Sequence, residues 1–386
     1  MEILTLPSIT PKTNLLHARI PPAGPPATSR HPRTISATAT KAPPHHQITH
    51  SMPPEKVEVF KSLEPWATET LLPFLKPVEK SWQPCDFLPD PTLPDSEFTD
   101  KVWSLRKSSR KLPDELFIVL VGDMVTEEAV PTYQSLINSC DAIKDDTGCS
   151  RSPWAIWTRG WSAEENRHGD LLRNYLYLSG RVDMRMIDKT VQYLIGAGMN
   201  SGVENNPYLG YVYVAFQERA TFLSHANTGR LARDQGNPLL ANICGIIAAD
   251  EKRHESAYIK MVEKLLEVDP NDTMLAIGNM MRKRVVMPGH LMHDGRDPHL
   301  YDHFASVARR VGVFSPNDYV DIVEFLVGRW HLEKVEGLKG DGRREQDFVC
   351  RLAPILRKMM AKEDNRAKNE TNRLKFSWIF NKEVIV

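Results

Sequence analysis

The sequence predicts an all-α protein, and two features of the 386-residue chain carry this prediction. Alternating polar and apolar residues, the pattern of a half-buried strand, form no convincing run except in the tail at residues 376–386. Proline, asparagine and glycine stand instead at intervals where helices begin and end. The pattern between them stays helical from Pro113 to beyond Pro270, so we expect helices packed on helices.

The composition is that of an ordinary globular protein. With 41% hydrophobic and 25% charged residues, the chain can bury a substantial core. Its formal net charge is zero, which gives no reason to expect nucleic acid or a membrane surface as a partner. No segment approaches the roughly 18 apolar residues of a membrane span. The five cysteines include no Cys-x-x-Cys pair, which argues against a disulfide framework or zinc site and favours a reducing compartment.

The first fifty residues differ from the rest. Residues 1–50 carry five basic side chains against Glu2 alone, are rich in proline, serine and threonine, and lack helical periodicity after Leu16. This composition is typical of an organelle transit peptide, and a disordered tail is the alternative. We therefore expect residues 51–386 to form a single domain. Its first part, residues 51–98, contains nine prolines and is predicted to form short helices and turns around something larger.

Helical signals become strong after Pro113, where Pro113-Asp114-Glu115 predicts a helix start. Ser152-Pro153, Asn206-Pro207 and Asn237-Pro238 each combine a capping residue with a proline at the first helical position. The predicted helices are 114–142 with a kink near Pro131, 153–179, 183–198, 206–233 and 238–268. Further helices should follow, with breaks at Pro288, Pro298 and Pro316.

A short pattern occurs twice: an acid, then Glu, any residue, Arg and His. The copies are Glu165-Asn166-Arg167-His168 and Glu251-Lys252-Arg253-His254. On an α-helix, a Glu and a His three residues apart can reach one metal ion. About one Glu-x-x-His is expected by chance, so it is the matched pair that predicts metal binding. The alternatives are a solvated face of ion pairs and, for Glu165, a capping box with Ser162.

Two more carboxylates would balance two divalent ions, because four Glu contribute about −4 to a buried site. Glu218 is the only acid between Asn206 and Arg233 and lies among apolar residues; its alternative is an ion pair with Arg219. The helix after Pro113 offers Glu127 or Glu128, and their spacing does not separate them. Carboxylate and imidazole ligands without thiolate favour iron or manganese. The set matches the known ferritin-like di-iron bundle, in which two helices each supply a Glu and two others each supply a Glu-x-x-His motif.

Several motifs closely resemble the plant soluble acyl-[acyl-carrier-protein] desaturases, and the resemblance covers residues 51–386. They are Pro73-Phe-Leu-Lys-Pro-Val-Glu, Trp82-Gln-Pro, Val121-Gly-Asp-Met-Val-Thr-Glu-Glu, Trp161-Ser-Ala-Glu-Glu-Asn-Arg-His-Gly-Asp, Phe216-Gln-Glu-Arg-Ala-Thr, Ala249-Asp-Glu-Lys-Arg-His and Gly295-Arg-Asp. The resemblance implies a ferritin-like bundle at about 114–268 that holds two ferrous ions. Its implied ligands are Glu127, Glu165, His168, Glu218, Glu251 and His254.

The resemblance also implies a homodimer in the plastid stroma that takes electrons from reduced ferredoxin and uses O₂. The expected reaction is desaturation of a saturated acyl chain on acyl carrier protein, with stearoyl to oleoyl at Δ9 as the first choice. Removing hydrogens from an unactivated methylene needs an oxidant that side chains lack. The alternatives are a shifted chain length or bond position, such as a palmitoyl substrate, a di-iron hydroxylase or radical-generating subunit, a ferritin-like iron store, and a catalytically idle paralogue that binds carrier protein.

Three further residues are candidates for catalytic roles. Thr221 lies three residues after Glu218 and could supply a proton during oxygen reduction, although a packing role fits equally well. Asp250 could hold the ring nitrogen of His168, with Trp82 beyond it on an electron path as the family suggests. The alternatives are a surface acid for Asp250 and a core packing residue for Trp82. The acidic carrier protein needs a basic dock. Candidates for that dock are Lys252, Arg253, Arg282, Lys283 and Arg284, for which solvated surface charge is the alternative.

The acyl pocket is where this chain departs from the familiar Δ9 members. By resemblance, the tail lies along residues 136–140 and 208–211, which include Gly210. This chain has Ser139 and Cys140 where those members have Thr and the larger Leu, and Tyr211 where they have Phe. Changes of one or two methylene groups shift selectivity by roughly 1–3 kcal/mol. The reaction class is therefore better determined by the sequence than the chain length or the bond position.

Overall fold

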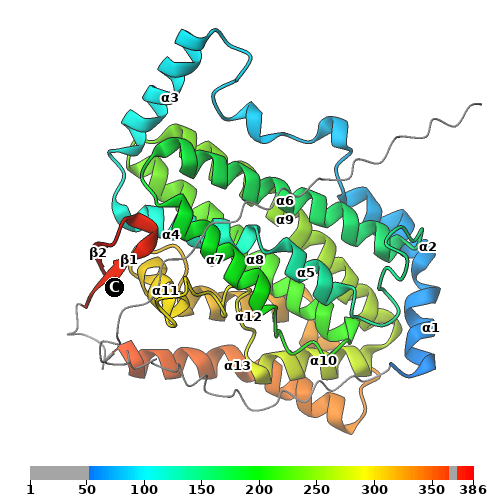
Figure 1. The fold of residues 1–386 in the computed structure, drawn as a ribbon. Helices are drawn as coiled ribbons and strands as arrows, with labels where there is room; N and C mark the ends of the chain where they lie inside the picture. Colours follow the sequence, from blue (N-terminus) through cyan, green and yellow to red (C-terminus); the bar gives the residue numbers. More distant parts are fainter. Residues whose placement is uncertain (1–51, 365–371) are drawn as a thin grey trace, which may run out of the picture. The chain divides into compact units, whose positions relative to one another are not determined.

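The structure, a computed structural model, describes residues 52–364 and 372–386. Helices dominate this part of the chain (Figure 1). Its strands are β1 (Arg373–Phe376) and β2 (Lys382–Ile385), which form an antiparallel hairpin in the predicted tail. The predicted all-α class is confirmed. In these residues no helix is long and apolar enough to cross a membrane. The predicted transit peptide at residues 1–50 lies outside the described residues.

Four helices make a closed bundle: α4 (Asp114–Glu127), α6 (Pro153–Ser179), α8 (Pro207–Asp234) and α9 (Pro238–Val268). Helix α8 packs along α9, α4 contacts both α6 and α8, and α6 contacts α9. Each of the four helices is thus in contact with two others. The predicted four-helix core is confirmed.

Capping explains why these helices begin where the sequence predicts. The side chain of Asn206 accepts a hydrogen bond from Tyr208 N at 2.9 Å, and that of Asn237 accepts one from Leu240 N at 3.0 Å. A proline follows each cap at the first helical position. Helix α6 ends at Gly180, whose φ of 64° is the left-handed conformation that glycine adopts without strain.

The predicted helix 114–142 is wrong in one respect, because it is two helices. Helix α4 ends at Glu127, and α5 runs from Val130 to Ile137. Pro131 has no backbone N–H, and its ring would clash with the carbonyl of Glu127 in a continuous helix. The chain therefore breaks at residues 128–129 instead of kinking. Glu127 becomes the last residue of α4, facing the bundle interior.

Before the bundle, residues 52–94 form the short helices α1 (Pro54–Ser62) and α2 (Glu64–Trp66) and single turns at residues 67–74, 78–80 and 84–86, as expected for a proline-rich segment. The helix α3 (Asp95–Ser109) was not predicted. Most of its residues are polar, and it contacts α6 near its C-terminal end, where Arg106 Nε donates to Leu178 O at 3.0 Å. In Figure 1, α3 extends away from the bundle.

The other helices surround the bundle. Helix α7 (Met184–Ala197) lies between α6 and α8 in the chain and contacts α4. After α9 come α10 (Pro270–Lys283), α11 (Leu300–Arg310), which also contacts α4, α12 (Pro316–Arg329) and α13 (Gly340–Asp364). The predicted breaks around Pro288 and Pro298 fall in the connection between α10 and α11, and Pro316 is the first residue of α12. The helices α10, α12 and α13 pack together, and α8 contacts α10 and α12.

Two apolar clusters form the core, one towards each end of the bundle. On α6, Trp157 and Trp161 belong to the first cluster and Leu172 to the second. On α9, Tyr258 belongs to the first cluster and Ile247 to the second. Both Glu-x-x-His copies lie between these positions on their helices. The apolar core is therefore interrupted at one level by buried polar side chains.

Candidate metal centre

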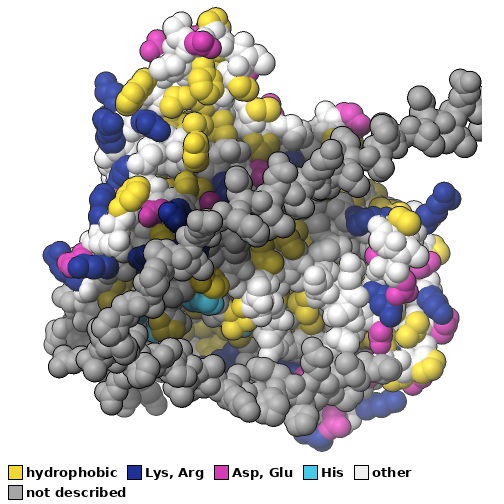
Figure 2. Space-filling model, viewed as in Figure 1, with side chains coloured by type: hydrophobic (Ala, Val, Ile, Leu, Met, Phe, Trp, Pro, Cys, Tyr) yellow, Lys and Arg dark blue, Asp and Glu magenta, His cyan; other side chains and the backbone are white. Residues whose placement is uncertain are grey.

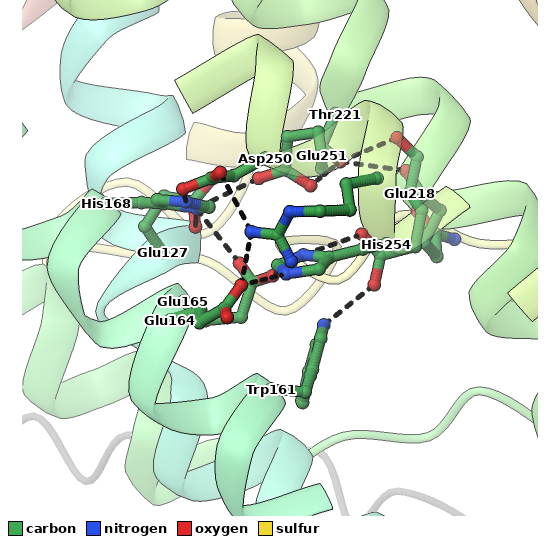
Figure 3. Close-up of polar contacts among 12 residues, drawn as sticks. Glu127, Trp161, Glu164, Glu165, His168, Glu218, Thr221, Asp250, Glu251 and His254 are labelled. Atoms are coloured by element: carbon green, nitrogen blue, oxygen red, sulfur yellow. Dashed lines mark hydrogen bonds and ion pairs between the residues drawn. The ribbon is translucent and has the colours of Figure 1, made fainter. Parts of the chain in front are cut away.

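The six predicted ligands meet in the middle of the bundle (Figure 3). They form two overlapping groups in which all potential ligand atoms lie within 4.8 Å of one another. One group contains Glu127, Glu165, His168 and Glu251, and the other contains Glu165, Glu218, Glu251 and His254. Glu165 and Glu251 belong to both groups. All six residues are buried, and both histidines are fully inaccessible to solvent.

The imidazoles turn the same ring nitrogen towards the carboxylates. His168 Nδ1 lies 3.1 Å from Glu251 Oε1 and 3.2 Å from Glu165 Oε2. His254 Nδ1 lies 2.7 Å from Glu165 Oε1 and 3.6 Å from Glu218 Oε2. The histidine of each Glu-x-x-His copy thus contacts the glutamate of the other copy across the bundle. The arrangement is that of two adjacent sites with two shared carboxylates.

The donor set fits two divalent metal ions. Five inward-facing atoms have no hydrogen-bond partner in the described part of the chain: Glu165 Oε1, His168 Nδ1, Glu218 Oε2, Glu251 Oε1 and His254 Nδ1. Buried polar atoms are otherwise nearly always paired, so these atoms point to a ligand. Four carboxylates balance two divalent ions, as burial of the charges requires. Oxygen and imidazole donors without thiolate suit iron or manganese.

Burial and neighbouring charges shift the pKa values of three of these residues in a direction that also points to cations. Burial raises the pKa of Glu218 well above its ordinary value. Burial, with the Glu165 and Glu127 carboxylates, raises the pKa of Glu251. Burial opposes charge on His254, yet the Glu165 carboxylate raises the pKa of His254 well above its ordinary value. The cluster thus favours positive charge among its carboxylates, a demand that metal ions would meet.

Asp250 and Trp82 both lie on the outer side of His168. Asp250 Oδ2 accepts a hydrogen bond from Trp82 Nε1 at 2.8 Å and lies 3.7 Å from His168 Nε2. The Trp82 ring stacks on the His168 ring with centroids 5.9 Å apart and planes 13° from parallel. Burial opposes ionisation of Asp250, but contacts with His168, Lys76 and Arg253 lower its pKa below its ordinary value. Asp250 is therefore a fully buried carboxylate beside the outer nitrogen of His168.

Glu164 is the counterpart of Asp250 and was not predicted from the sequence. Glu164 Oε2 lies 2.8 Å from His254 Nε2, so each imidazole has an outer carboxylate beside it. Glu164 precedes Glu165 as Asp250 precedes Glu251, and each of the two outer acids serves the histidine of the other copy. The signal was present in the sequence, since both copies begin with an acid. Outer carboxylates of this kind orient ligand histidines and fix their tautomer.

The carboxylates that belong to a single group are each held by one N–H donor from another helix. Trp161 Nε1 donates to Glu218 Oε1 at 2.9 Å. His225 Nε2 lies 2.8 Å from Glu127 Oε1. Neither donor was predicted. The neighbouring Glu128 does not enter the cluster and instead forms an ion pair with Arg173 at 2.9 Å.

Thr221 contacts one of the shared carboxylates. Its Oγ1 lies 2.7 Å from Glu251 Oε2 and 3.1 Å from the backbone oxygens of Gln217 and Glu218. One hydroxyl proton can serve only one of these acceptors at a time. Thr221 also lines the cavity beside the cluster. It is therefore a hydroxyl group at the edge of the centre, in contact with a predicted ligand.

An apolar cavity of about 170 Å³ reaches the carboxylates. The four predicted ligand carboxylates and Thr221 form one part of its wall, and much of the rest is apolar. A second cavity of about 30 Å³ shares Leu136, Ile137, Tyr213 and Val214 with the first. Cys140, Gly210 and Tyr211 line this second cavity. Ser139 lines neither of the two and donates to Leu136 O at 2.6 Å, so its prediction as a pocket residue is not supported.

With this geometry established, similarity to known proteins identifies the family. The model of the fatty acid desaturase family matches residues 55–380. The chain belongs to this family. Among its relatives, stearoyl-[acyl-carrier-protein] 9-desaturase 6, chloroplastic, of Arabidopsis thaliana is 60% identical over 362 residues, which is 92% of this chain and 93% of the relative.

Two further relatives of the family are similar to nearly the same extent. Stearoyl-[acyl-carrier-protein] 9-desaturase 1, chloroplastic, of Oryza sativa subsp. indica is 60% identical over 354 residues, covering 91% of this chain and 92% of the relative. The stearoyl-[acyl-carrier-protein] 9-desaturase, chloroplastic, of Ricinus communis is 59% identical over 340 residues, covering 88% and 85%. The resemblance that the motifs suggest is thus confirmed along most of the chain.

The five predicted dock residues fall into two groups. Lys252 is half exposed on α9 and pairs with Glu255, while Arg282, Lys283 and Arg284 are exposed at the end of α10. Arg253 is different, because its guanidinium faces inwards. It donates to Phe74 O at 2.7 Å, to Asp250 Oδ1 at 2.8 Å and to Glu164 Oε2 at 2.5 Å. Arg253 therefore holds the two outer acids, Asp250 and Glu164, by hydrogen bonds. We no longer include it in the proposed dock.

Asp123 gives the fold a pH dependence of its own. It lines the larger cavity one turn before Glu127, and its Oδ1 accepts from Ser224 Oγ at 3.0 Å. Burial raises the pKa of Asp123 to about 6 from an ordinary value of 3.8. Between these values the folded protein keeps a proton that the unfolded chain releases. The neutral Asp123 carboxyl therefore stabilises the folded protein at low pH, and this stabilisation is lost as the pH rises towards 6.

We expect Asp123→Asn to stabilise the protein at neutral pH, because an amide cannot ionise. The gain over wild type should grow between about pH 4 and pH 6, reach about 1–3 kcal/mol, and then stay constant. Urea unfolding at several pH values measures it. Ser224→Ala, which removes the hydroxyl but keeps the acid, serves as the control and should keep the pH dependence. A gain for Asp123→Asn that does not vary with pH would contradict the assignment.

Proposed function

We propose that this chain is an acyl-[acyl-carrier-protein] desaturase that uses O₂ to introduce a double bond into a saturated acyl chain. Stearoyl to oleoyl, with the bond at Δ9, is the proposed reaction. The observation that carries the proposal is the cavity of about 170 Å³, which is largely apolar and has a wall of four buried ligand-type carboxylates. An apolar chain in this cavity would lie directly beside the centre. The relatives, which are stearoyl-[acyl-carrier-protein] 9-desaturases by name, support the same substrate.

We propose two iron ions as the cofactor, held by the six residues of the two overlapping groups. When bound, iron would supply the reduction of O₂ that gives an oxidant strong enough for an unactivated C–H bond. The protein's part is to bind the acyl chain, aim one methylene pair at the carboxylate wall and exclude water through the apolar lining. Thr221 Oγ1, 2.7 Å from Glu251 Oε2, can hold or move a proton at the edge of the cavity.

We propose reduced ferredoxin as the electron donor and Trp82 with Asp250 as the entry path. The Trp82 ring, stacked on His168 and hydrogen-bonded to Asp250, links the metal centre to the segment before α3. Acyl carrier protein is acidic, so the exposed Lys252, Arg282, Lys283 and Arg284 remain candidates for its dock. The word chloroplastic in the names of the relatives supports a plastid location, with residues 1–50 as the transit peptide and residues 51–386 as one desaturase domain.

We also propose that the enzyme is a homodimer. Hydrophobic side chains gather over α3 and the neighbouring segment (Figure 2). Trp103 of α3 is 54% exposed, and Phe98 and Val102 are only partly covered. Apolar surface of this kind on a helix with few internal contacts is typical of an interface. The molar mass in solution, measured by light scattering, tests this proposal.

Product analysis tests the proposed reaction. The full-length protein with bound iron is incubated with stearoyl-acyl carrier protein, reduced ferredoxin and O₂, and the position of the double bond is read by mass spectrometry. We expect oleoyl product with the bond at Δ9. Palmitoyl-acyl carrier protein is the comparison substrate. A product without a Δ9 bond, or a hydroxylated product, would contradict the stearoyl assignment while leaving the metal centre intact.

A shifted chain length is the second candidate, and the small cavity favours it. This cavity extends the larger one past Leu136 and Val214 towards Cys140 and Tyr211, so we take it to receive the end of the acyl tail. A thiol at Cys140 leaves more room there than a leucine would. The length of this extension sets how many carbons can lie beyond the carboxylate wall. The chain-length preference should therefore respond to the volume of residue 140.

We expect Cys140→Leu to shift the preference towards the shorter chain. Leucine fills the extension, so the ratio of kcat/KM for 20-carbon over 18-carbon substrate should fall by roughly 10- to 100-fold, from the 1–3 kcal/mol of such changes. Competition assays with both substrates measure the ratio. Ser139→Thr is the matched control, because Ser139 lines neither cavity. An unchanged ratio in Cys140→Leu, or an equal change in the control, would remove Cys140 from the acyl pocket.

A further inference from the structure

Two hydrogen bonds join the side chains of α4 and α8 beside the metal centre. Ser224 Oγ donates to Asp123 Oδ1 at 3.0 Å, and His225 Nε2 lies 2.8 Å from Glu127 Oε1. The donors are consecutive on α8, and the acceptors are one helical turn apart on α4. Both bonds therefore tie the same two helices at nearly the same level. Only the bond from His225 reaches a predicted metal ligand.

The His225 bond is buried and has a defined direction. His225 is 1% exposed and Glu127 is 6% exposed. An ionised ligand carboxylate can only accept hydrogen bonds, so Nε2 of His225 must carry the proton and donate it. This tautomer is assigned from the hydrogen-bond pattern. The imidazole therefore directs its protonated nitrogen at Glu127.

A hydrogen bond from a side-chain N–H to a ligand carboxylate also occurs on the other side of the centre. Glu218, the carboxylate that belongs only to the second group, receives Trp161 Nε1 on Oε1 at 2.9 Å. Among the described residues, the shared carboxylates Glu165 and Glu251 have no indole N–H and no third histidine beside them. Their nitrogen contacts there are with His168 and His254. Each of the two unshared ligands, Glu127 in the first group and Glu218 in the second, thus accepts a hydrogen bond from an N–H donor outside the ligand set.

We propose that His225 is a positioning residue of the metal centre. Its Nε2–H holds Glu127 Oε1 and leaves Oε2 turned towards His168 Nδ1, 3.6 Å away. His225 thereby stabilises the metal ion of the first group, as Trp161 stabilises that of the second. The inference rests on the proposed metal centre, because Glu127 must hold an ion. Loss of an outer partner of a ligand typically costs about 10- to 100-fold in metal affinity.

The test is metal release from the full-length holoenzyme. Iron-loaded protein is mixed anaerobically with excess ferrous chelator, and the release of the two ions is followed by absorbance. We expect His225→Leu to release one ion about 10- to 100-fold faster than wild type and the other at the wild-type rate. His225→Gln, which keeps a side-chain N–H of similar reach, should restore most of the difference. Mössbauer spectra of the loaded variants should change for one of two iron environments.

Two controls separate positioning from a purely structural role. Ser224→Ala removes the neighbouring bond between the same helices and should leave both release rates unchanged. Trp161→Phe should accelerate the release of the other ion. If His225→Leu does not fold, His225→Met, which also lacks the donor, replaces it. Unchanged release in the donor-free variants, or equal acceleration of both ions, overturns the inference. A wild-type protein that holds no pair of metal ions would instead overturn the proposed function.

Discussion

Replacing Glu127 by Gln is expected to reduce olefin formation at least about 100-fold, beyond the range for losing only an outer partner of a ligand. Glu127 contributes an oxygen to the first group of ligands and accepts the hydrogen bond from His225. The amide removes one of four negative charges that balance two divalent ions. Turnover of stearoyl-acyl carrier protein, together with iron content per subunit, measures the effect.

Glu128→Gln is the matched control for this prediction. Glu128 is the next residue, carries the same charge and pairs with Arg173 outside the cluster. We expect near wild-type turnover and two irons per subunit. Equal losses in both variants would mean that the substitutions act by disturbing the end of α4 and not by removing a metal ligand. Full activity in Glu127→Gln would remove Glu127 from the ligand set.

Replacing Arg253 by Met is expected to lower the free energy of unfolding by about 3 kcal/mol, the lower end of the range for breaking a buried ion pair. Arg253 donates to both Glu164 and Asp250, the acids beside the two histidines. Its side chain is 18% exposed, so some solvent screening remains. Without it, two buried carboxylates lose a common counter-charge. Urea unfolding of the metal-loaded protein, followed by circular dichroism, measures the change.

Lys252→Met is the control for Arg253. Lys252 is the adjacent residue, and its side chain is 46% exposed. A surface substitution of this kind usually changes stability by less than about 0.5 kcal/mol. Lys252→Met should instead weaken the apparent affinity for acyl carrier protein if the dock proposal holds. Equal destabilisation by the two substitutions would contradict the inward role of Arg253.

Local signals explain what could be predicted from the sequence. The starts of α8 and α9 depend on Asn206 and Asn237, whose side chains cap the helix within three residues. The Glu-x-x-His pairs depend on helical spacing alone, so Glu165, His168, Glu251 and His254 were found without knowledge of the packing. Glu218 was found because it is the only acid on its segment of helix.

Contacts between helices explain what could not be predicted. Adjacent residues on a helix point about 100° apart, so the choice between Glu127 and Glu128 depends on how α4 is rotated against α6. The pairing of His225 with Glu127, and of Trp161 with Glu218, depends on the same register. Arg253 looked like surface charge because its partners, Glu164 and the carbonyl of Phe74, are distant in sequence. Helix α3 lacks the apolar periodicity of a packed helix.

A single sample can show whether the six buried residues hold two irons that serve acyl desaturation. The full-length protein is loaded with iron, reduced under anaerobic conditions, supplied with stearoyl-acyl carrier protein and then exposed to a limited amount of O₂. Iron per subunit and olefin are measured in the same sample. We predict two irons per subunit and oleoyl product with the bond at Δ9. Uptake of many irons into a mineral core, with no olefin formed, would contradict the account.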